Sequence, residues 1–187
     1  MSNYNNVLNI VPTSVLNNLV TSKSTDIPSF TSLTNDFDSQ NIRLKTTMGY
    51  YYLRVNDEGS YWIHENYMNR STFTSFQYLS SSSEMRVCNT SGYSNVYIAL
   101  DNQAVQDKVS SGNCYLTTIA GNLSRKMKIF KMEEGYLIKT LDDKYLSLDM
   151  TQLNGTYNKY PAVLSKLTDQ TSPKKLAYLE IHSYVHK

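Results

Sequence analysis

The feature that most constrains this chain is a succession of short stretches, from residue 44 onward, in which apolar and polar residues alternate. Turn-forming residues separate these stretches, and no helical periodicity lasts longer than about two turns. Alternation with a period of two is typical of strands that bury one face and leave the other in water. The pattern therefore predicts an all-β protein, either a barrel or a sandwich.

The clearest hairpin is predicted at residues 135–149, GYLIKTLDDKYLSLD. Its two alternating halves meet at Asp142 and Asp143, and Asp favours turns because its side chain hydrogen bonds to nearby backbone groups. The second half, Tyr145 to Asp149, consists of a tyrosine, a large apolar residue, two further residues and an acid. This signature is the best marker for a search for internal repeats.

Two other stretches match the signature, Tyr97 to Asp101 and Tyr61 to Glu65, at spacings of 48 and 36 residues. Each copy lies between two further alternating stretches, so three units fill residues 44 to about 183. A lone hairpin cannot bury its apolar face, whereas three such units around one axis share a core. The stretches before the signature are 52–55, 85–88 and 136–141, and those after it are 76–79, 127–130 and 176–181.

This arrangement resembles the β-trefoil family, which includes ricin-B-like lectins, toxin-associated haemagglutinin modules, fibroblast growth factors and Kunitz-type inhibitors. The resemblance covers about three quarters of the chain and implies a six-stranded barrel capped by three hairpins. A β-sandwich is the alternative. The expected division is a polar N-terminal arm over residues 1–42, with a possible short helix over 11–20, followed by a trefoil domain over residues 43–187.

Charge and hydropathy limit the partners. The formal net charge is +2, which is too small to predict nucleic-acid binding. Lysines alternate with apolar residues in the basic run 125–131, which predicts a strand with one solvated face. No apolar run approaches the length of a membrane span. The first residues lack a basic start and a long apolar run, so a cleaved secretory signal is not expected. We therefore expect synthesis in the cytoplasm, with packaging or release by another route, and possible homo-oligomerisation through the arm.

The sequence contains none of the common catalytic or metal-binding motifs. The prediction is a protein that is not an enzyme, with no cofactor and no metal. Cys88 and Cys114 could form one bridge or remain free thiols. A reactive pair of either cysteine with His64 is the less common alternative to a buried structural thiol.

The trefoil resemblance implies shallow sugar pockets, one in each repeat, in which an acid binds sugar hydroxyls and an aromatic ring stacks on the sugar. Trp62 is either such a stacking platform or a core residue, and the core is the commoner place for tryptophan. The Gln-x-Trp triplet of ricin-B-like repeats is absent. The candidate ligand-binding residues are Asp57, Trp62 and His64 in the first repeat, Asp101 and Asn102 in the second, and Asp142, Asp149, Tyr157 and Tyr160 in the third.

Longer connections at residues 103–113 and 151–160 are predicted to project from the scaffold, and loops of this kind often carry recognition. They add Asn158, beside Tyr157 and Tyr160, to the candidates. The sequence thus predicts a non-enzymatic recognition module for a glycan or protein surface, with carbohydrate as the first choice of ligand and a toxin or host-interaction system as the expected context. The alternative is a self-assembling inclusion or toxin-accessory protein, and the third is a Kunitz-type protease inhibitor.

Overall fold

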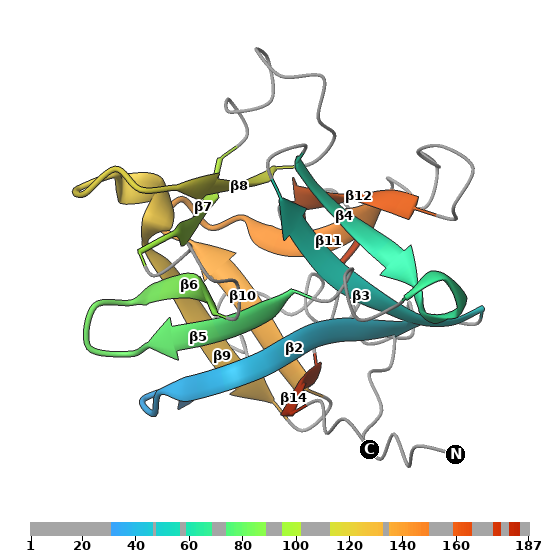
Figure 1. Cartoon of the computed structure of the whole chain (residues 1–187). Coiled ribbons are helices and arrows are strands. Elements are labelled where there is room, and N and C mark those ends of the chain that lie inside the picture. The colour runs from blue at the N-terminus through green and yellow to red at the C-terminus, as the bar shows by residue number, and fades with distance from the viewer. Residues whose placement is uncertain are drawn as a thin grey trace.

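A computed structural model describes residues 31–46, 48–56, 59–68, 74–88, 95–101, 113–132, 135–149, 159–165, 174–176 and 180–183. Strands dominate these residues, which confirms the all-β prediction (Figure 1). The strands are β1 (Thr31–Ser32), β2 (Phe37–Thr46), β3 (Gly49–Asn56), β4 (Gly59–His64), β5 (Ser75–Leu79), β6 (Glu84–Cys88), β7 (Tyr97–Leu100), β8 (Cys114–Thr117), β9 (Met127–Met132), β10 (Gly135–Thr140), β11 (Tyr145–Asp149), β12 (Lys159–Ser165), β13 (Lys174–Leu176) and β14 (Glu180–Ser183). Among the described residues, two 3-10 turns, η1 (Glu65–Tyr67) and η2 (Leu123–Arg125), connect strands. In the described part of the chain, no helix has the length and apolar character needed to cross a membrane.

Strand pairing repeats in three units of four strands: β2 to β5, β6 to β9, and β10, β11, β12 and β14. In every unit the first strand pairs with the second, and the second pairs with the third, always antiparallel. The first strand also lies against the last. β2 pairs with β5, β6 meets the residue just before β9 through the bridge between Glu84 and Lys126, and β10 contacts β14. The three units therefore share one internal plan.

The units are joined to one another by the same kind of pairing. β5 pairs with β6, β9 with β10, and β14 with β2. Six strands, β2, β5, β6, β9, β10 and β14, thus follow one another around a ring. Each unit contributes one further hairpin, made by β3 and β4, β7 and β8, or β11 and β12, and β12 also pairs with β4 (Figure 1).

The structure corrects the alignment of the first repeat. Tyr61 lies in β4, the third strand of its unit, whereas Tyr97 and Tyr145 lie in second strands. The equivalent second strand is β3, where Tyr52 to Asn56 reads Tyr, apolar, variable, apolar, polar. Tyr52 precedes Tyr97 by 45 residues, and 48 residues separate Tyr97 from Tyr145, so the corrected repeats are nearly equal in length.

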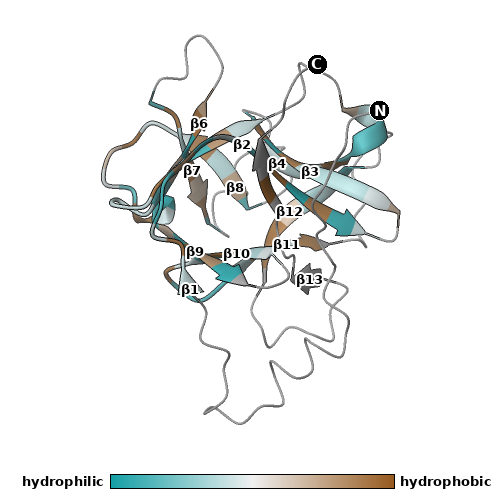
Figure 2. Ribbon diagram, turned by 90° about the horizontal axis from the view of Figure 1, so that it is seen from below, coloured by the Kyte–Doolittle hydropathy of each residue, from teal (hydrophilic) through white to brown (hydrophobic). Residues whose placement is uncertain are grey.

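Equivalent positions of the second strands form one layer of the core. The residues one and three places after each signature tyrosine are all at most 5% exposed. These side chains point inward because alternate residues of a strand face the same side. Figure 2 shows the resulting mixture of brown hydrophobic and teal hydrophilic positions along the strands. The core residues in question are Leu53, Val55, Ile98, Leu100, Leu146 and Leu148.

The structure also bears on the predicted turn at residues 142–143 and on the N-terminal arm. The turn between β10 and β11 forms at Asp142 and Asp143 as predicted, with the Thr140 amide donating to the Lys144 carbonyl at 2.8 Å. Residues 31–42, expected in the arm, include β1, which pairs with β9, and the first part of β2. The expected helix over 11–20 lies outside the described residues.

Candidate functional site

A cleft of about 250 Å³ lies between the η2 segment and the turn that joins β10 to β11. The cleft sits where β9 begins and β10 ends, at the junction of the second and third units. It brings together Asp101 and Asp142, two candidates predicted from different repeats. Its polar lining is Asp101, Ser124, Lys126, Thr140, Asp142 and Lys144, and its apolar lining is Leu100, Leu123, Leu141 and Leu164.

Polar side chains beside this cleft form a hydrogen-bonded series that ends at an aromatic residue. The Ser124 hydroxyl donates to Asp101 Oδ2 at 3.1 Å, and the Ser124 amide donates to Asn122 Oδ1 at 2.9 Å. The Asn122 amide nitrogen donates in turn to the Tyr115 hydroxyl at 3.1 Å. We call these four residues the Asp101–Tyr115 series. They hold a carboxylate, an amide, a hydroxyl and a half-buried aromatic ring in one fixed arrangement.

Local structure explains how the series forms. The Asp101 amide donates to the Asn113 carbonyl at 2.9 Å, so the β7–β8 hairpin continues one residue beyond Leu100. Asn122 is the N-cap of η2, a position that favours Asn because its side-chain oxygen accepts an otherwise unpaired amide hydrogen. Gly121 precedes it with a φ of +79°, a backbone conformation that glycine adopts without strain.

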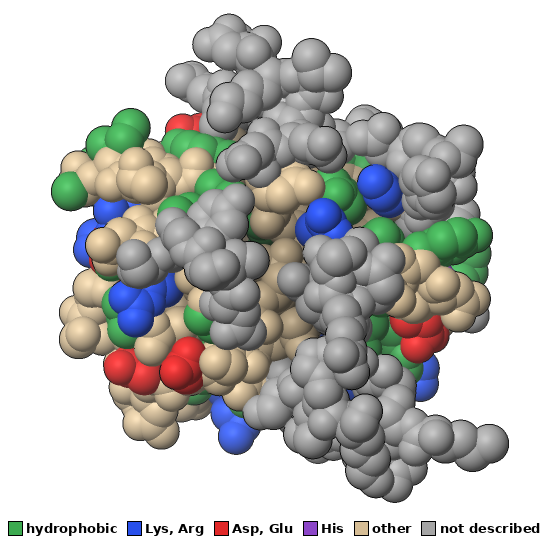
Figure 3. All heavy atoms as spheres, viewed as in Figure 1, with side chains coloured by type: hydrophobic (Ala, Val, Ile, Leu, Met, Phe, Trp, Pro, Cys, Tyr) green, Lys and Arg blue, Asp and Glu red, His purple; other side chains and the backbone are tan. Residues whose placement is uncertain are grey.

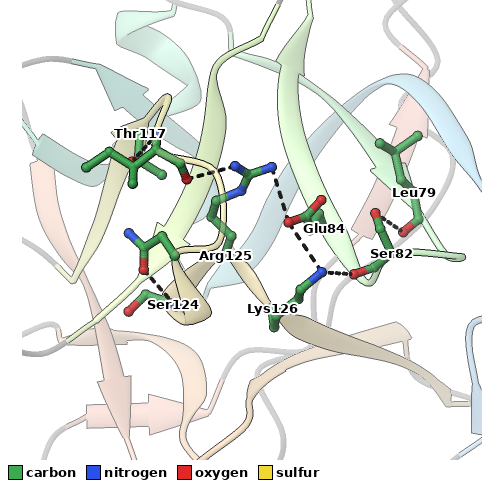
Figure 4. Close-up of polar contacts among 9 residues, drawn as sticks. Leu79, Ser82, Glu84, Thr117, Ser124, Arg125 and Lys126 are labelled. Atoms are coloured by element: carbon green, nitrogen blue, oxygen red, sulfur yellow. Dashed lines mark hydrogen bonds and ion pairs between the residues drawn. The ribbon is translucent and has the colours of Figure 1, made fainter.

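Arg125 anchors the η2 segment to the neighbouring strands. Its side chain is 7% exposed, with Nη2 placed 3.1 Å from Glu84 Oε1 and Nη1 donating to the Ile119 carbonyl at 2.9 Å. Its guanidinium carbon lies 3.4 Å from the centre of the Tyr97 ring. Figure 4 shows Arg125 reaching across to Glu84 from the segment that carries Ser124. The inward guanidinium therefore fixes η2 against β6 and β7.

Lys126 completes this network and also lines the cleft. Its Nζ lies 3.4 Å from Glu84 Oε1 and donates to the Ser82 carbonyl at 2.8 Å (Figure 4). On the opposite side of the cleft, Lys144 Nζ lies 2.5 Å from Asp142 Oδ2. Hydrogen bonds from Lys144 and from the Thr140 hydroxyl hold the pKa of the Asp142 carboxyl below its ordinary value. The lysines of the cleft are thus already paired with acids.

Aliphatic side chains project around the same cleft. Leu123 is 73% exposed and Leu141 is 58% exposed, and both line it. Ile119, on the segment that leads into η2, is 66% exposed. The remaining exposed large hydrophobic residues among those described are Met48 and Tyr67. On the face in Figure 3, charged side chains of both signs are scattered among polar and hydrophobic ones.

Two candidates of the first repeat serve the structure itself. Trp62 is completely buried and donates from Nε1 to the Ser147 carbonyl at 3.1 Å, so it is a core residue and is not available for stacking. His64 Nδ1 accepts the Asn66 amide, which caps η1, and its Nε2 lies 2.8 Å from the Met48 carbonyl. Because Nδ1 accepts, Nε2 carries the proton and donates it to Met48.

The other candidates are not part of the cleft in the described residues. Tyr160 was expected on a projecting loop, but it lies in β12 opposite Trp62, where it is buried with its ring 5.5 Å from that of Tyr51. Asp149 is the last residue of β11, and its side chain is not described. Asp57, Asn102, Tyr157 and Asn158 lie outside the described residues.

Neither cysteine forms a bridge. Cys88 and Cys114 are free thiols, and burial raises the pKa of Cys114 to about 12. A thiol held protonated in this way is a poor nucleophile and a poor metal ligand. Within the described ranges, no group of three or more His, Cys, Asp or Glu side chains is arranged to hold a metal ion.

Sequence reasoning missed Tyr115, Asn122 and Ser124. The Gly-Asn pair at 121–122 does signal a turn. Nothing in the sequence indicates that the amide of this turn would reach back to Tyr115, because that contact depends on the path of the connection between β8 and β9.

Comparisons of this chain with protein-family models, with curated proteins and with solved structures find no match.

Proposed function

We propose that this chain is a non-enzymatic recognition module built on a β-trefoil, and that it binds carbohydrate at the Asp101–Tyr115 series. The fold proposal is supported by three units with one pairing plan, by six strands that follow one another around a ring, and by one further hairpin in each unit. A sandwich would instead pack two separate sheets face to face.

The observation that carries the ligand proposal is the hydrogen-bonded link between the Asp101 carboxylate and the Tyr115 ring. A carboxylate accepts hydrogen bonds from neighbouring sugar hydroxyls, and the amide of Asn122 can both donate and accept. An aromatic ring with a polar tip offers an apolar face for the C–H side of a pyranose. Because hydrogen bonds link the four residues, one of them through the Ser124 backbone amide, little conformational freedom is lost when a ligand binds.

The adjoining cleft provides room for the rest of a saccharide. Its polar groups, Thr140 and Asp142, lie across from Ser124, while Leu123 and Leu141 present apolar side chains at its edge. This mixture matches a ligand with hydroxyls on one side and C–H groups on the other. Ligand sites in general combine apolar walls with a few placed polar groups.

A glycan array of the full chain tests the proposal, with Asp101→Asn as the site variant and Asp143→Asn as the control. Asp143 is 76% exposed on the neighbouring turn and is not part of the series or the cleft. We expect Asp101→Asn to weaken binding about tenfold or more, because a charge-assisted hydrogen bond is lost, and Asp143→Asn to leave it unchanged. An array without glycan hits, or equal binding by both variants, contradicts the proposal.

A second candidate function is protein contact, including self-assembly, and the exposed side chains of Leu123 and Leu141 at the cleft, with Ile119 exposed on the segment that leads into η2, favour it. Exposed apolar side chains gathered at one place often mark protein interfaces. Sedimentation of the full chain at several concentrations, compared with the Leu123→Ser/Leu141→Ser double variant, distinguishes this function. Association that disappears in the double variant supports it, and a monomer at every concentration excludes self-assembly.

A further inference from the structure

A second cavity, of about 360 Å³, lies beside the turn between β5 and β6. Three separate segments enclose it: residues 32–34, the end of β5 with its turn, and the middle of β9. The Leu33 amide donates to the Ile129 carbonyl at 2.7 Å, which holds the first segment along β9. The described lining is Ser32, Leu33, Thr34, Tyr78, Ser80, Ser81, Ser83, Lys128 and Ile129. None of these residues lines the cleft at Asp101.

The lining has an unusual chemistry for a surface cavity. Six of its nine described residues carry a hydroxyl group, and one, Lys128, carries an ammonium on the exposed face of β9. No carboxylate belongs to this described lining. Hydroxyls donate and accept hydrogen bonds, and the ammonium only donates. The cavity therefore suits a ligand that has several hydroxyls of its own and one negative charge.

Hydrogen bonds hold three of these hydroxyls in place. Asp36 Oδ1 accepts both the Ser80 amide, at 2.7 Å, and the Ser80 hydroxyl, at 2.6 Å. The Tyr78 hydroxyl is hydrogen-bonded to the Ser83 side chain, and Tyr78 is 3% exposed. Because Ser80 donates to Asp36, its oxygen can still accept a hydrogen bond from a ligand.

Backbone strain at Ser83 points to a use for its hydroxyl. Ser83 has a φ of +56°, in the left-handed region that residues with a Cβ avoid. Hairpin turns that need this conformation usually place Gly, Asn or Asp there. Serine at this position keeps a hydroxyl at the cavity in a strained backbone, and strain of this kind gathers at functional sites.

We propose that this cavity is a second binding site, specific for a saccharide unit that bears a carboxylate. The Lys128 ammonium pairs with the carboxylate, and the hydroxyls of Ser32, Thr34, Ser80, Ser81 and Ser83 exchange hydrogen bonds with those of the sugar. The site is independent of the Asp101–Tyr115 series, because the two have no described residue in common.

Titration of the isotope-labelled full chain by NMR, with glucuronate, glucose and sodium sulfate as separate probes, tests this site. Glucuronate and glucose differ at C6, where a carboxylate replaces a hydroxymethyl group. We expect glucuronate to shift the amide signals of Ser81, Ser83 and Lys128 and to bind about tenfold or more tightly than glucose, because its carboxylate gains a charge-assisted hydrogen bond. Equal binding of glucose, or sulfate binding as strongly as glucuronate, overturns the proposal.

Two lysines of β9 give a matched pair of variants. Lys128 and Lys131 are both exposed, but Lys131 does not belong to the described lining of the cavity. Lys128→Ala should weaken glucuronate about tenfold, and Lys131→Ala should leave its affinity unchanged. If both variants weakened glucuronate binding equally, glucuronate would be attracted only by the surface charge of β9, and the proposed site would be wrong. Lys128→Ala should leave glycan binding at Asp101 unchanged. The experiment can therefore reject the glucuronate site without rejecting the carbohydrate site proposed above.

Ser83→Gly separates the hydroxyl from the turn. Glycine relieves the strain at φ +56° but also removes the hydrogen-bond partner of the buried Tyr78 hydroxyl, so the two effects on stability oppose each other and the variant should still fold, which its thermal unfolding checks. It should nevertheless bind glucuronate more weakly, by about threefold to tenfold, because one neutral hydrogen bond is lost. A variant that folds well and binds glucuronate as tightly as the wild type would show that the hydroxyl of Ser83 is not used.

Discussion

The guanidinium of Arg125 lies over the ring of Tyr97, with its Cζ 3.4 Å from the ring centre, while its Nη2 lies 3.1 Å from Glu84 Oε1. A buried arginine can stay charged only if its charge is matched nearby. The ring face supplies part of this match and the Glu84 carboxylate the rest. The connection between β8 and β9 is therefore held to the core by an ion pair.

Removing the carboxylate should destabilise the protein strongly. Glu84→Ala leaves Arg125 buried without its counter-ion and removes the acceptor that Lys126 shares. Breaking a buried pair in this way costs about 3 kcal/mol in the free energy of unfolding. Urea denaturation followed by circular dichroism measures the loss.

Asp143→Ala is the control for this comparison. Asp143 pairs with Lys139 at 2.5 Å, but its side chain is 76% exposed. Exposed pairs contribute between about 0 and 1 kcal/mol, because water screens them. If Glu84→Ala and Asp143→Ala lowered the free energy of unfolding equally, the buried Glu84–Arg125 pair would stabilise the protein no more than an exposed pair does.

We expect Trp62 to serve as a fluorescence probe of the core and to contribute to its stability. It is the only tryptophan in the chain and is completely buried, so the native fluorescence should be blue-shifted and should move to the red on unfolding. Trp62→Phe loses the hydrogen bond to the Ser147 carbonyl and leaves a small cavity, whereas Trp62→Ala leaves a large one and should cost about 3 to 5 kcal/mol. Native emission at the wavelength of exposed tryptophan would contradict this placement.

Much of the fold was accessible from the sequence because alternation directly reflects which face of a strand is buried. The hairpin at residues 135–149 was predicted with its turn at the right residues, since its alternation and its two aspartates agree. The first repeat was misaligned because Tyr61 to Glu65 resembles the signature locally. The order of strand pairing, β2 with β3 and β3 with β4, shows that Tyr61 lies in a third strand and that Tyr52 is the true equivalent.

The candidate site was less predictable. Asp101 and Asp142 were chosen for their chemistry, but their shared cleft depends on how the second and third units meet. Arg125 belongs to a basic run that alternates like a strand, which predicts an exposed face. The run does form β9 from Met127 onward, with Lys128 exposed as predicted, but Arg125 lies in η2 and turns inward to an acid 41 residues earlier, Glu84. Contacts between residues so far apart leave no local pattern.

Alkaline pH should weaken the fold through buried tyrosines. Burial, together with Tyr160, raises the pKa of Tyr51 from 10.0 to about 12. Between these values the unfolded chain loses this proton while the folded protein keeps it, so the free energy of unfolding falls as pH rises from about 10 to about 12. Tyr51→Phe should make this fall less steep, measured as the urea midpoint against pH. Some decline should remain, because burial also raises the pKa of Tyr78 and Tyr145.

Two glycines with positive φ should respond differently to alanine. A Cβ at Gly49, where φ is +118°, would lie 2.8 Å from Glu65 Oε1 and 2.9 Å from His64 Nε2. Neither neighbour can move freely, because Glu65 Oε1 accepts the Tyr50 amide and His64 donates to the Met48 carbonyl. Gly49→Ala should therefore cost about 3 kcal/mol or more, from strain and overpacking together.

Gly121 isolates the contribution of the backbone. Its φ is +79°, but a Cβ there would meet no atom within 4 Å, so Gly121→Ala should cost only about 1 to 2 kcal/mol from left-handed strain. The difference between the two variants, measured by urea denaturation, gives the steric part at Gly49. Equal losses of stability from the two variants would contradict the expected clash of a Cβ at Gly49 with His64 and Glu65.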